Sequence, residues 1–216
     1  MFVEESVWIK EALEKIEDID GVNAIDIGSA DLFTRTRLQP HIQQNLYAPL
    51  EKRKIKIFST DKRNEPGVDY CINLCQDELL VNTIKTKFGL IIAANVLEHL
   101  YNRENAIKNI LSLLDLQTGY LLITVPNNYF RHDEDDTMYR PTPDSLLTFI
   151  EKYASFTVIK KDLLRINQAS YYVMPYYYNK ILHHVPFFPM RKFYRWLIPS
   201  FRWRVSCVLL KVKNLK

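Results

Sequence analysis

Short runs of apolar, mostly β-branched residues recur along this chain, each bounded by polar residues or glycine. Runs of this length and composition predict buried β-strands. The runs 88–94 and 120–125 are apolar almost throughout, which is typical of strands covered on both faces. The expected strands are 23–27, 55–60, 70–74, 88–94, 120–125, 156–159 and 204–212, and Pro126 should end the fifth of them.

Helical periodicity fills most of the segments between these strands. Residues 6–17 place their apolar side chains on one face, and Ser6 is the expected N-cap. Segment 31–50 should also contain a helix, although Pro40 and Pro49 are expected to interrupt it. The expected helices are 6–17, 76–86, 103–116 and 143–153.

Strands that alternate with helices require crossover connections, and these produce a mostly parallel sheet. The pattern therefore predicts an α/β fold with a seven-stranded, mostly parallel sheet and helices on both faces. The last strand should run antiparallel, because the segment before it lacks a regular helical crossover. The 216 residues fit a single domain, 1–216, in which 163–203 is an aromatic and basic cap before the last strand.

Charge is distributed unevenly. Residues 1–159 hold 17 Lys and Arg against 24 Asp and Glu, whereas residues 160–216 hold 12 against one. The basic part is also rich in aromatic residues, so an anionic partner is expected for it. The chain starts without a signal-peptide pattern and has no apolar run of membrane-spanning length. Its three cysteines lack metal-type spacing, so we assign no metal ligand and expect a cytoplasmic protein with free thiols.

Polar residues stand where the expected strands end. The first strand leads into Gly28, one of only five glycines, which indicates a sharp turn or a close approach to a ligand. The second strand ends at Asp61, whose carboxylate could accept hydrogen bonds from both hydroxyls of a ribose; the alternative is a solvated turn acid. Because ligands bind at the carboxyl ends of strands in such sheets, these residues are candidates for one site.

The strand-end motifs resemble those of class I S-adenosylmethionine-dependent methyltransferases, in particular the small bacterial type with a Val-Leu-Glu-His-Leu signature. The resemblance covers roughly residues 6–161 and the last strand. Its most specific parts follow the fourth and fifth strands. The matching segments are Ile25-Asp26-Ile27-Gly28-Ser29-Ala30, Asp61, Asn95-Val96-Leu97-Glu98-His99-Leu100, Val125-Pro126-Asn127 and Tyr139-Arg140-Pro141.

This resemblance implies a Rossmann-like sheet, S-adenosyl-L-methionine as the methyl donor and S-adenosyl-L-homocysteine as the product. It places the methionine part of the donor over residues 26–30, the ribose at Asp61, the adenine near residues 73 and 74, and the transferable methyl beside Asn95. The cofactor-binding residues expected on this basis are Asp26, Gly28, Ser29, Ala30, Asp61, Asn73, Leu74 and Asn95.

Two histidines are candidates for the base that removes a proton from a methyl acceptor. His99 follows the fourth strand, and the alternative is a residue that only packs or caps a helix. His132 lies in an acidic segment after the fifth strand, where neighbouring carboxylates could support it. That acidic segment could instead be a solvated loop, or could hold a hard cation through oxygen ligands.

The expected function is methyl transfer to oxygen or nitrogen of a small acceptor or of one that carries a lipid or phosphate. Residues 163–203 could close over the acceptor, complete the core, or touch the inner face of a membrane through 187–203. Nucleic acid is an unfavoured partner, because residues 1–159 carry net negative charge. Ala30 and Leu32 replace glycines that such loops usually carry, so the alternative function is a non-catalytic binding or scaffold protein with this fold.

Overall fold

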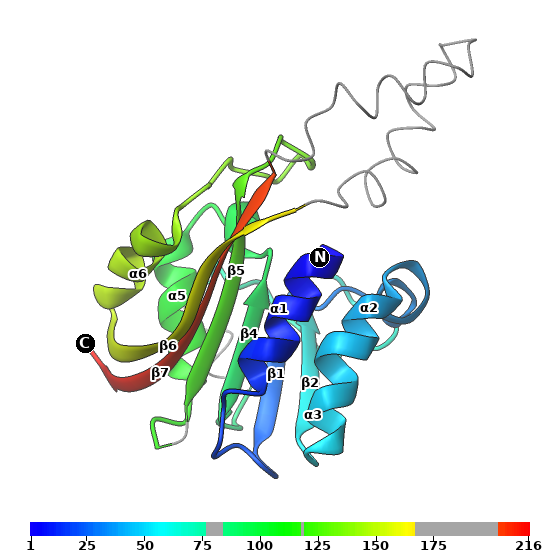
Figure 1. Cartoon of the computed structure of the whole chain (residues 1–216), viewed down its shortest axis with the longest axis vertical. Coiled ribbons are helices and arrows are strands. Elements are labelled where there is room, and N and C mark those ends of the chain that lie inside the picture. Colours follow the sequence, from blue (N-terminus) through cyan, green and yellow to red (C-terminus); the bar gives the residue numbers. More distant parts are fainter. Residues whose placement is uncertain (77–83, 118, 167–202) are drawn as a thin grey trace.

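A seven-stranded sheet with the order β3-β2-β1-β4-β5-β7-β6 organises the molecule (Figure 1). The computed structural model describes residues 1–76, 84–117, 119–166 and 203–216. Every described pairing is parallel except those of β7, which runs antiparallel to both β5 and β6. The expected fold class, including the antiparallel last strand, is therefore confirmed. The strands are β1 (Asn23–Ile27), β2 (Lys56–Asp61), β3 (Tyr70–Cys71), β4 (Leu90–Ala94), β5 (Tyr120–Asn128), β6 (Ala154–Arg165) and β7 (Arg204–Leu215).

Helices cover the sheet on both faces (Figure 1). Alternate residues of the central strands enter two separate cores, as the two-residue period of a strand requires. Ile25 of β1 packs in the core beneath α5 and α6, whereas the neighbouring Ala24 packs in the core beneath α1. The helices are α1 (Val3–Leu13), α2 (Pro40–Ile42), α3 (Ala48–Lys52), α5 (Arg103–Ser112) and α6 (Pro143–Glu151).

The first helix begins earlier than expected. Helix α1 starts at Val3 with Phe2 as its N-cap, so the assignment of Ser6 as the N-cap is wrong. Ser6 is fully buried, and its hydroxyl donates to the Val3 carbonyl oxygen at 2.7 Å. The Phe2 N–H instead donates to the Glu5 carboxylate at 3.0 Å. A carboxylate in the first turn can therefore accept a backbone N–H at the helix start, as the side chain of a serine cap would.

Segment 31–50 is more helical than its prolines suggested. Two π-helical turns, Thr34–Leu38 and Gln43–Tyr47, alternate with α2 and α3. Pro40 and Pro49 each stand in the first turn of a helix, where a missing N–H leaves no hydrogen bond broken. The prolines therefore divide this segment into short helices without ending it.

Strand β5 passes through Pro126 and ends at Asn128, so the expectation that Pro126 ends the strand is wrong. The last β5 residue paired with β4 is Thr124, and the pairing with β7 changes register between Pro126 and Asn128. A proline is tolerated at such an edge or bulge because no ladder bond there needs its N–H.

The sixth strand is also longer than expected and includes residues 163–165, which were expected to begin the cap. Residues 163–165 belong to β6 and pair with Ser206, Val205 and Arg204 of β7. Most of the expected cap lies in 167–202, outside the described residues. Most of the expected helix 76–86 also lies outside them, in 77–83. Trp203 is described and packs on the ring of Tyr129, with 5.0 Å between ring centroids. None of the described helices is long and apolar enough to cross a membrane.

Candidate active site

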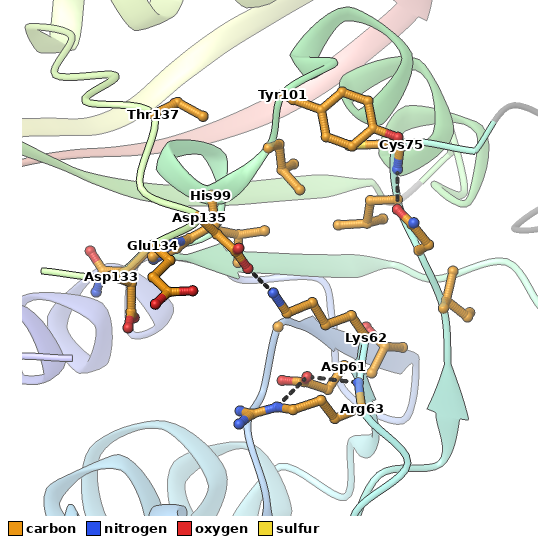
Figure 2. Close-up of a pocket in the computed structure, with 18 of the residues that line it drawn as sticks. Asp61, Lys62, Arg63, Cys75, His99, Tyr101, Asp133, Glu134, Asp135 and Thr137 are labelled. Carbon is orange, nitrogen blue, oxygen red and sulfur yellow. Dashed lines mark hydrogen bonds and ion pairs between the residues drawn. The ribbon is translucent and has the colours of Figure 1, made fainter. Parts of the chain in front are cut away.

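A cavity of about 1120 Å³ opens at the carboxyl ends of the parallel strands. It lies where the strand order reverses between β1 and β4, which is the usual ligand position in open α/β sheets. Figure 2 shows side chains that enter it from the ends of several strands and from the loop after β5. Seven of the ten predicted site residues line it: Gly28, Asp61, Asn73, Leu74, Asn95, His99 and His132.

Gly28 has a backbone conformation and a neighbour that favour glycine. Its φ is +70°, and a Cβ added there would lie 2.6 Å from Cγ2 of Val96. Two residues later, Ala30 has a φ of +58°, which is unfavourable for a residue with a side chain. The loop therefore turns as a glycine-rich loop would, although alanine occupies one of its left-handed positions.

Asp61 holds this loop from the end of β2. Its Oδ2 accepts the Ala30 N–H at 3.2 Å, and its Oδ1 accepts the Arg63 N–H at 3.1 Å. A carboxylate offers about four acceptor positions, so Asp61 can accept further hydrogen bonds from a ligand. Asp61 thus connects β1 and β2 at the edge of the cavity.

Asp26 lies beneath the loop and does not line the cavity, and neither do Ser29 and Ala30. Asp26 is 4% exposed, and its Oδ2 accepts the hydroxyl hydrogen of Tyr47 at 2.6 Å. Burial raises the pKa of Asp26 to about 6, although Tyr47 and Arg35 oppose that shift. Of the residues expected beneath the methionine part, Gly28 therefore lines the cavity, whereas the Asp26 side chain is buried against Tyr47.

Asn73 and Leu74 line the cavity beyond β3, on the side expected for the adenine. Asn73 Oδ1 accepts the Cys75 N–H at 3.0 Å, which shapes the turn. Asn109 of α5 donates to the carbonyl oxygen of Leu74 at 3.1 Å. This turn is therefore held by a side chain from a helix beneath it.

Asn95 is held by an acid that the sequence did not indicate as part of the site. Its φ is +55°, and its Nδ2 donates to both carboxylate oxygens of Glu5, at 2.9 and 3.0 Å. Glu5 is fully buried in α1 and also accepts the hydroxyl hydrogen of Thr124. The only local signal was an acid three residues after an apolar one at the start of a helix, which resembles a cap. Its contact with Asn95 spans 90 residues.

The two candidate histidines lie together at the other end of the cavity. The ring centroids of His99 and His132 are 5.0 Å apart and the rings meet edge to face. Burial, followed by the neighbouring His132, lowers the pKa of His99. A neutral imidazole can accept a proton or bind a metal ion.

His132 is supported by a buried carboxylate, as the acidic segment had suggested. Its Nδ1 lies 2.9 Å from Oδ2 of Asp136, which also accepts from Arg140 Nη2 at 2.5 Å. Burial alone would raise the pKa of Asp136, but hydrogen bonds from Arg140 and the Met138 N–H outweigh it and lower that pKa to about 2. Asp136 is therefore a permanent negative charge beside His132 at neutral pH.

Glu98 is the second residue that the sequence did not assign to the site. It is fully buried in the turn Leu97–His99, and burial raises its pKa to about 8. Neither carboxylate oxygen has a hydrogen-bond partner within the described part of the chain. Its Oε1 lies 3.8 Å from Nε2 of His99.

Charged side chains of both signs form the rim of the cavity. Lys62, after β2, makes an ion pair across it with Asp135 of the loop after β5 (Figure 2). Asp133 and Glu134 lie beside Asp135 on the same loop. The half of the rim that follows β5 is thus the more acidic one.

Comparisons with known proteins support the fold. No protein-family model matches the chain, and no curated protein sequence does. Among solved structures, coclaurine N-methyltransferase bound to N-methylheliamine and S-adenosylhomocysteine aligns with a TM-score of 0.58 and 15% identity. That alignment covers 96% of this chain and 71% of the other.

Two further structures are similar. The O-methyltransferase from a trans-AT PKS multienzyme of Brevibacillus brevis, in complex with S-adenosyl-L-homocysteine, aligns with a TM-score of 0.57 and 13% identity over 97% of this chain and 73% of the other. The [4+2]-cyclase SpnF aligns with a TM-score of 0.55 and 14% identity over 95% and 80%. This chain therefore has the Rossmann-like fold of these methyltransferase structures, which a cyclase also uses.

Proposed function

We propose that this chain is an S-adenosyl-L-methionine-dependent methyltransferase that moves a methyl group to oxygen or nitrogen of an acceptor. One observation carries the proposal. A glycine loop after β1 and polar residues after β2, β3 and β4 line a single cavity at the switch point of the sheet. Fold alone would not support an activity, because the same fold hosts different reactions.

The described residues fit the methyl donor. Gly28 keeps the loop close to Val96, and Asp61 presents to the cavity a carboxylate that could accept hydrogen bonds from ribose hydroxyls. Asn95 has a buried Oδ1 without a hydrogen-bond partner in the described chain, so it can accept a bond from a ligand. The bound donor would supply a methyl group that is already activated as a sulfonium.

The task of the protein is then to position the acceptor and to remove its proton. Positioning contributes much of the rate enhancement of such a reaction, because the donor and the acceptor are held in line. His132, which lies beside the Asp136 carboxylate, and His99 are the proposed proton acceptors. A base is needed for a hydroxyl or a protonated amine.

We propose a small acceptor or one that carries a lipid or phosphate. Lys62, Arg63 and Arg131 line the cavity and supply the positive charge that a phosphate would contact. Peripheral membrane contact through 187–203 is a separate proposal, since those residues lie outside the described part except Trp203. Co-sedimentation with anionic vesicles tests it, and a protein that stays in the supernatant overturns it.

Calorimetric titration with S-adenosyl-L-homocysteine tests the methyl-donor site. We expect binding by the wild type and a loss of about 10- to 100-fold in affinity for Asp61→Ala, the size expected for lost hydrogen bonds to a charged group. Asp133→Ala, which changes an acid at the other end of the cavity, should keep the wild-type affinity.

A non-catalytic binding or scaffold protein is the second candidate function. The strained Ala30 in the loop favours it, because a glycine there would adopt the same φ without strain. The absence of measurable heat with millimolar S-adenosyl-L-homocysteine would favour this candidate over the enzyme.

A further inference from the structure

Three side chains at the acceptor end of the cavity could serve together as ligands of one ion. Glu98, His99 and His132 each offer one ligand atom, and these atoms lie within 4.8 Å of one another. They come from the turn after β4 and the loop after β5, so the fold and not a local motif brings them together. The spacing of the cysteines gave no sign of such a group.

Glu98 is the strongest reason to expect a ligand there. Burying a carboxylate without a partner is costly, and native proteins pair nearly all such groups. Glu98 is fully buried, and neither of its oxygens has a hydrogen bond to any described residue. Oε1 of Glu98 lies 3.8 Å from Nε2 of His99, beyond hydrogen-bond distance. A cation between the two would satisfy both.

The surroundings of His132 have the form seen around metal-bound histidines. Such a histidine usually contacts a carboxylate through its other ring nitrogen, which sets the ring orientation. Asp136 lies 2.9 Å from Nδ1 of His132, without hydrogen-bond geometry among the described residues, and is itself held by Arg140. The imidazole rings of His99 and His132 are about one-quarter exposed, so an ion can reach them from the cavity.

We propose that Glu98, His99 and His132 bind one divalent transition-metal ion of the zinc, iron or manganese class. Two imidazoles and one carboxylate select this class over magnesium or calcium, which prefer oxygen ligands alone. Ligand bonds to zinc of about 2.1 Å place two ligand atoms roughly 3.4 Å apart in a tetrahedral site. The spacing of up to 4.8 Å between the ligand atoms therefore needs to close by about 1.4 Å at most.

Three protein ligands leave a position open on the ion toward the cavity, as in catalytic metal sites. A bound ion of this class lowers the pKa of an oxygen that it contacts. In the ion-bound protein, His99 and His132 are ligands, so the removal of the acceptor proton no longer depends on a free imidazole. The site shares His99 and His132 with the proposed methyl transfer, but ion binding can be measured without that reaction.

Titration of the chelator-stripped full chain with Zn²⁺ tests the proposal directly. We expect one Zn²⁺ per chain, and Co²⁺ should give the visible absorption of a site with imidazole ligands. Glu98→Gln should lower the Zn²⁺ affinity by at least about tenfold, as should His132→Ala. Glu134→Gln makes the same chemical change in the same cavity and should leave the affinity unchanged.

Several results would overturn this site. They are an absence of Zn²⁺ binding, equal affinity in wild type and Glu98→Gln, or a loss caused by Glu134→Gln instead, which would indicate the acidic loop. Thermal unfolding followed by circular dichroism confirms that each variant is folded. Titration of the stripped wild type with S-adenosyl-L-homocysteine separates the two proposals, because donor binding without Zn²⁺ binding removes only the metal site.

Discussion

The two ends of the cavity differ in how their polar groups are satisfied. At the end formed by β1, β2 and β3, Asp61 and Asn73 accept hydrogen bonds from nearby backbone N–H groups. At the end formed by β4 and β5, Glu98 and Oδ1 of Asn95 are buried without hydrogen-bond partners in the described residues. The first end is therefore preformed by the chain itself, whereas the second keeps buried acceptor oxygens to which a ligand could bind.

This difference follows from how each end is built. The first end consists of short turns after strands, where a side chain reaches the backbone within the same turn or the next one. The second end joins the turn 97–99 to the loop 129–140, and its charged groups meet only after the chain has crossed the sheet. Binding sites are often drawn from such long loops, since loops can present groups that the core does not satisfy.

The largest expected effect is at Gly28. Gly28→Ala places a methyl group 2.6 Å from Cγ2 of Val96 at a φ of +70°. Overpacking and left-handed strain together should cost roughly 2–4 kcal/mol of unfolding free energy and abolish donor binding. Chemical denaturation and calorimetry measure the two effects.

Gly21→Ala is the matched control for Gly28→Ala. Gly21 has a similar φ of +76°, but nothing lies within 4 Å of its added Cβ. Gly21→Ala should therefore lower the unfolding free energy only by the strain of the left-handed backbone, about 1 kcal/mol. Adding Val96→Ala to Gly28→Ala should recover part of the lost unfolding free energy. Equal losses at Gly21 and Gly28 would show that the close approach of residue 28 to Val96 is unimportant.

The second-largest loss of stability and donor binding is expected at the end of the cavity formed by β4 and β5, where Glu5 holds Asn95. Glu5→Gln replaces one acceptor oxygen with an NH₂ group that faces the donors of Asn95, Thr124 or Phe2. We expect a loss of about 1–3 kcal/mol in unfolding free energy, the usual cost of an unsatisfied buried group, and weaker donor binding. Thermal unfolding and titration with S-adenosyl-L-homocysteine would measure these losses.

Glu11→Gln provides the control on the same helix. Glu11 is 58% exposed and pairs with Lys160, so its loss should change stability by less than about 0.5 kcal/mol. If Glu5→Gln lowers stability but leaves donor affinity unchanged, Glu5 is structural and does not position Asn95.

The smallest effect is expected at Ala30, in the preformed end. Ala30→Gly removes the strain of a φ of +58°, but it also makes the unfolded chain more flexible. The net gain should be a few tenths to about 1 kcal/mol of unfolding free energy. A destabilised variant with weaker donor binding would show that the alanine methyl group makes a useful contact.

Much of the fold was accessible from local patterns. The β1 bounds were predicted to the residue, and Gly28 was identified as a position needing a special backbone conformation. The effects of the prolines were predicted wrongly, because a helix or strand accepts a proline at some positions and not at others. Pro126 is accepted where β4 has ended, and Pro40 where a helix begins.

The candidate site was predictable only in part, since strand ends can be found in the sequence but side-chain directions cannot. The carboxyl ends of parallel strands share an edge, so Asp61, Asn73 and Asn95 were expected together. Asp26 stands in the same motif, yet it points into the core toward Tyr47. The alternating direction of side chains and the partner across the core decide this orientation.

The sequence by itself determined which elements form, their order along the chain and the polar residues at their ends, because these depend on hydrophobic period and turn chemistry. Only the tertiary structure decided that Glu5 meets Asn95, that Asp136 lies beside His132 and that Glu98 is buried near both histidines. Burial and contacts between distant segments set these relations, and no local pattern in the chain records them.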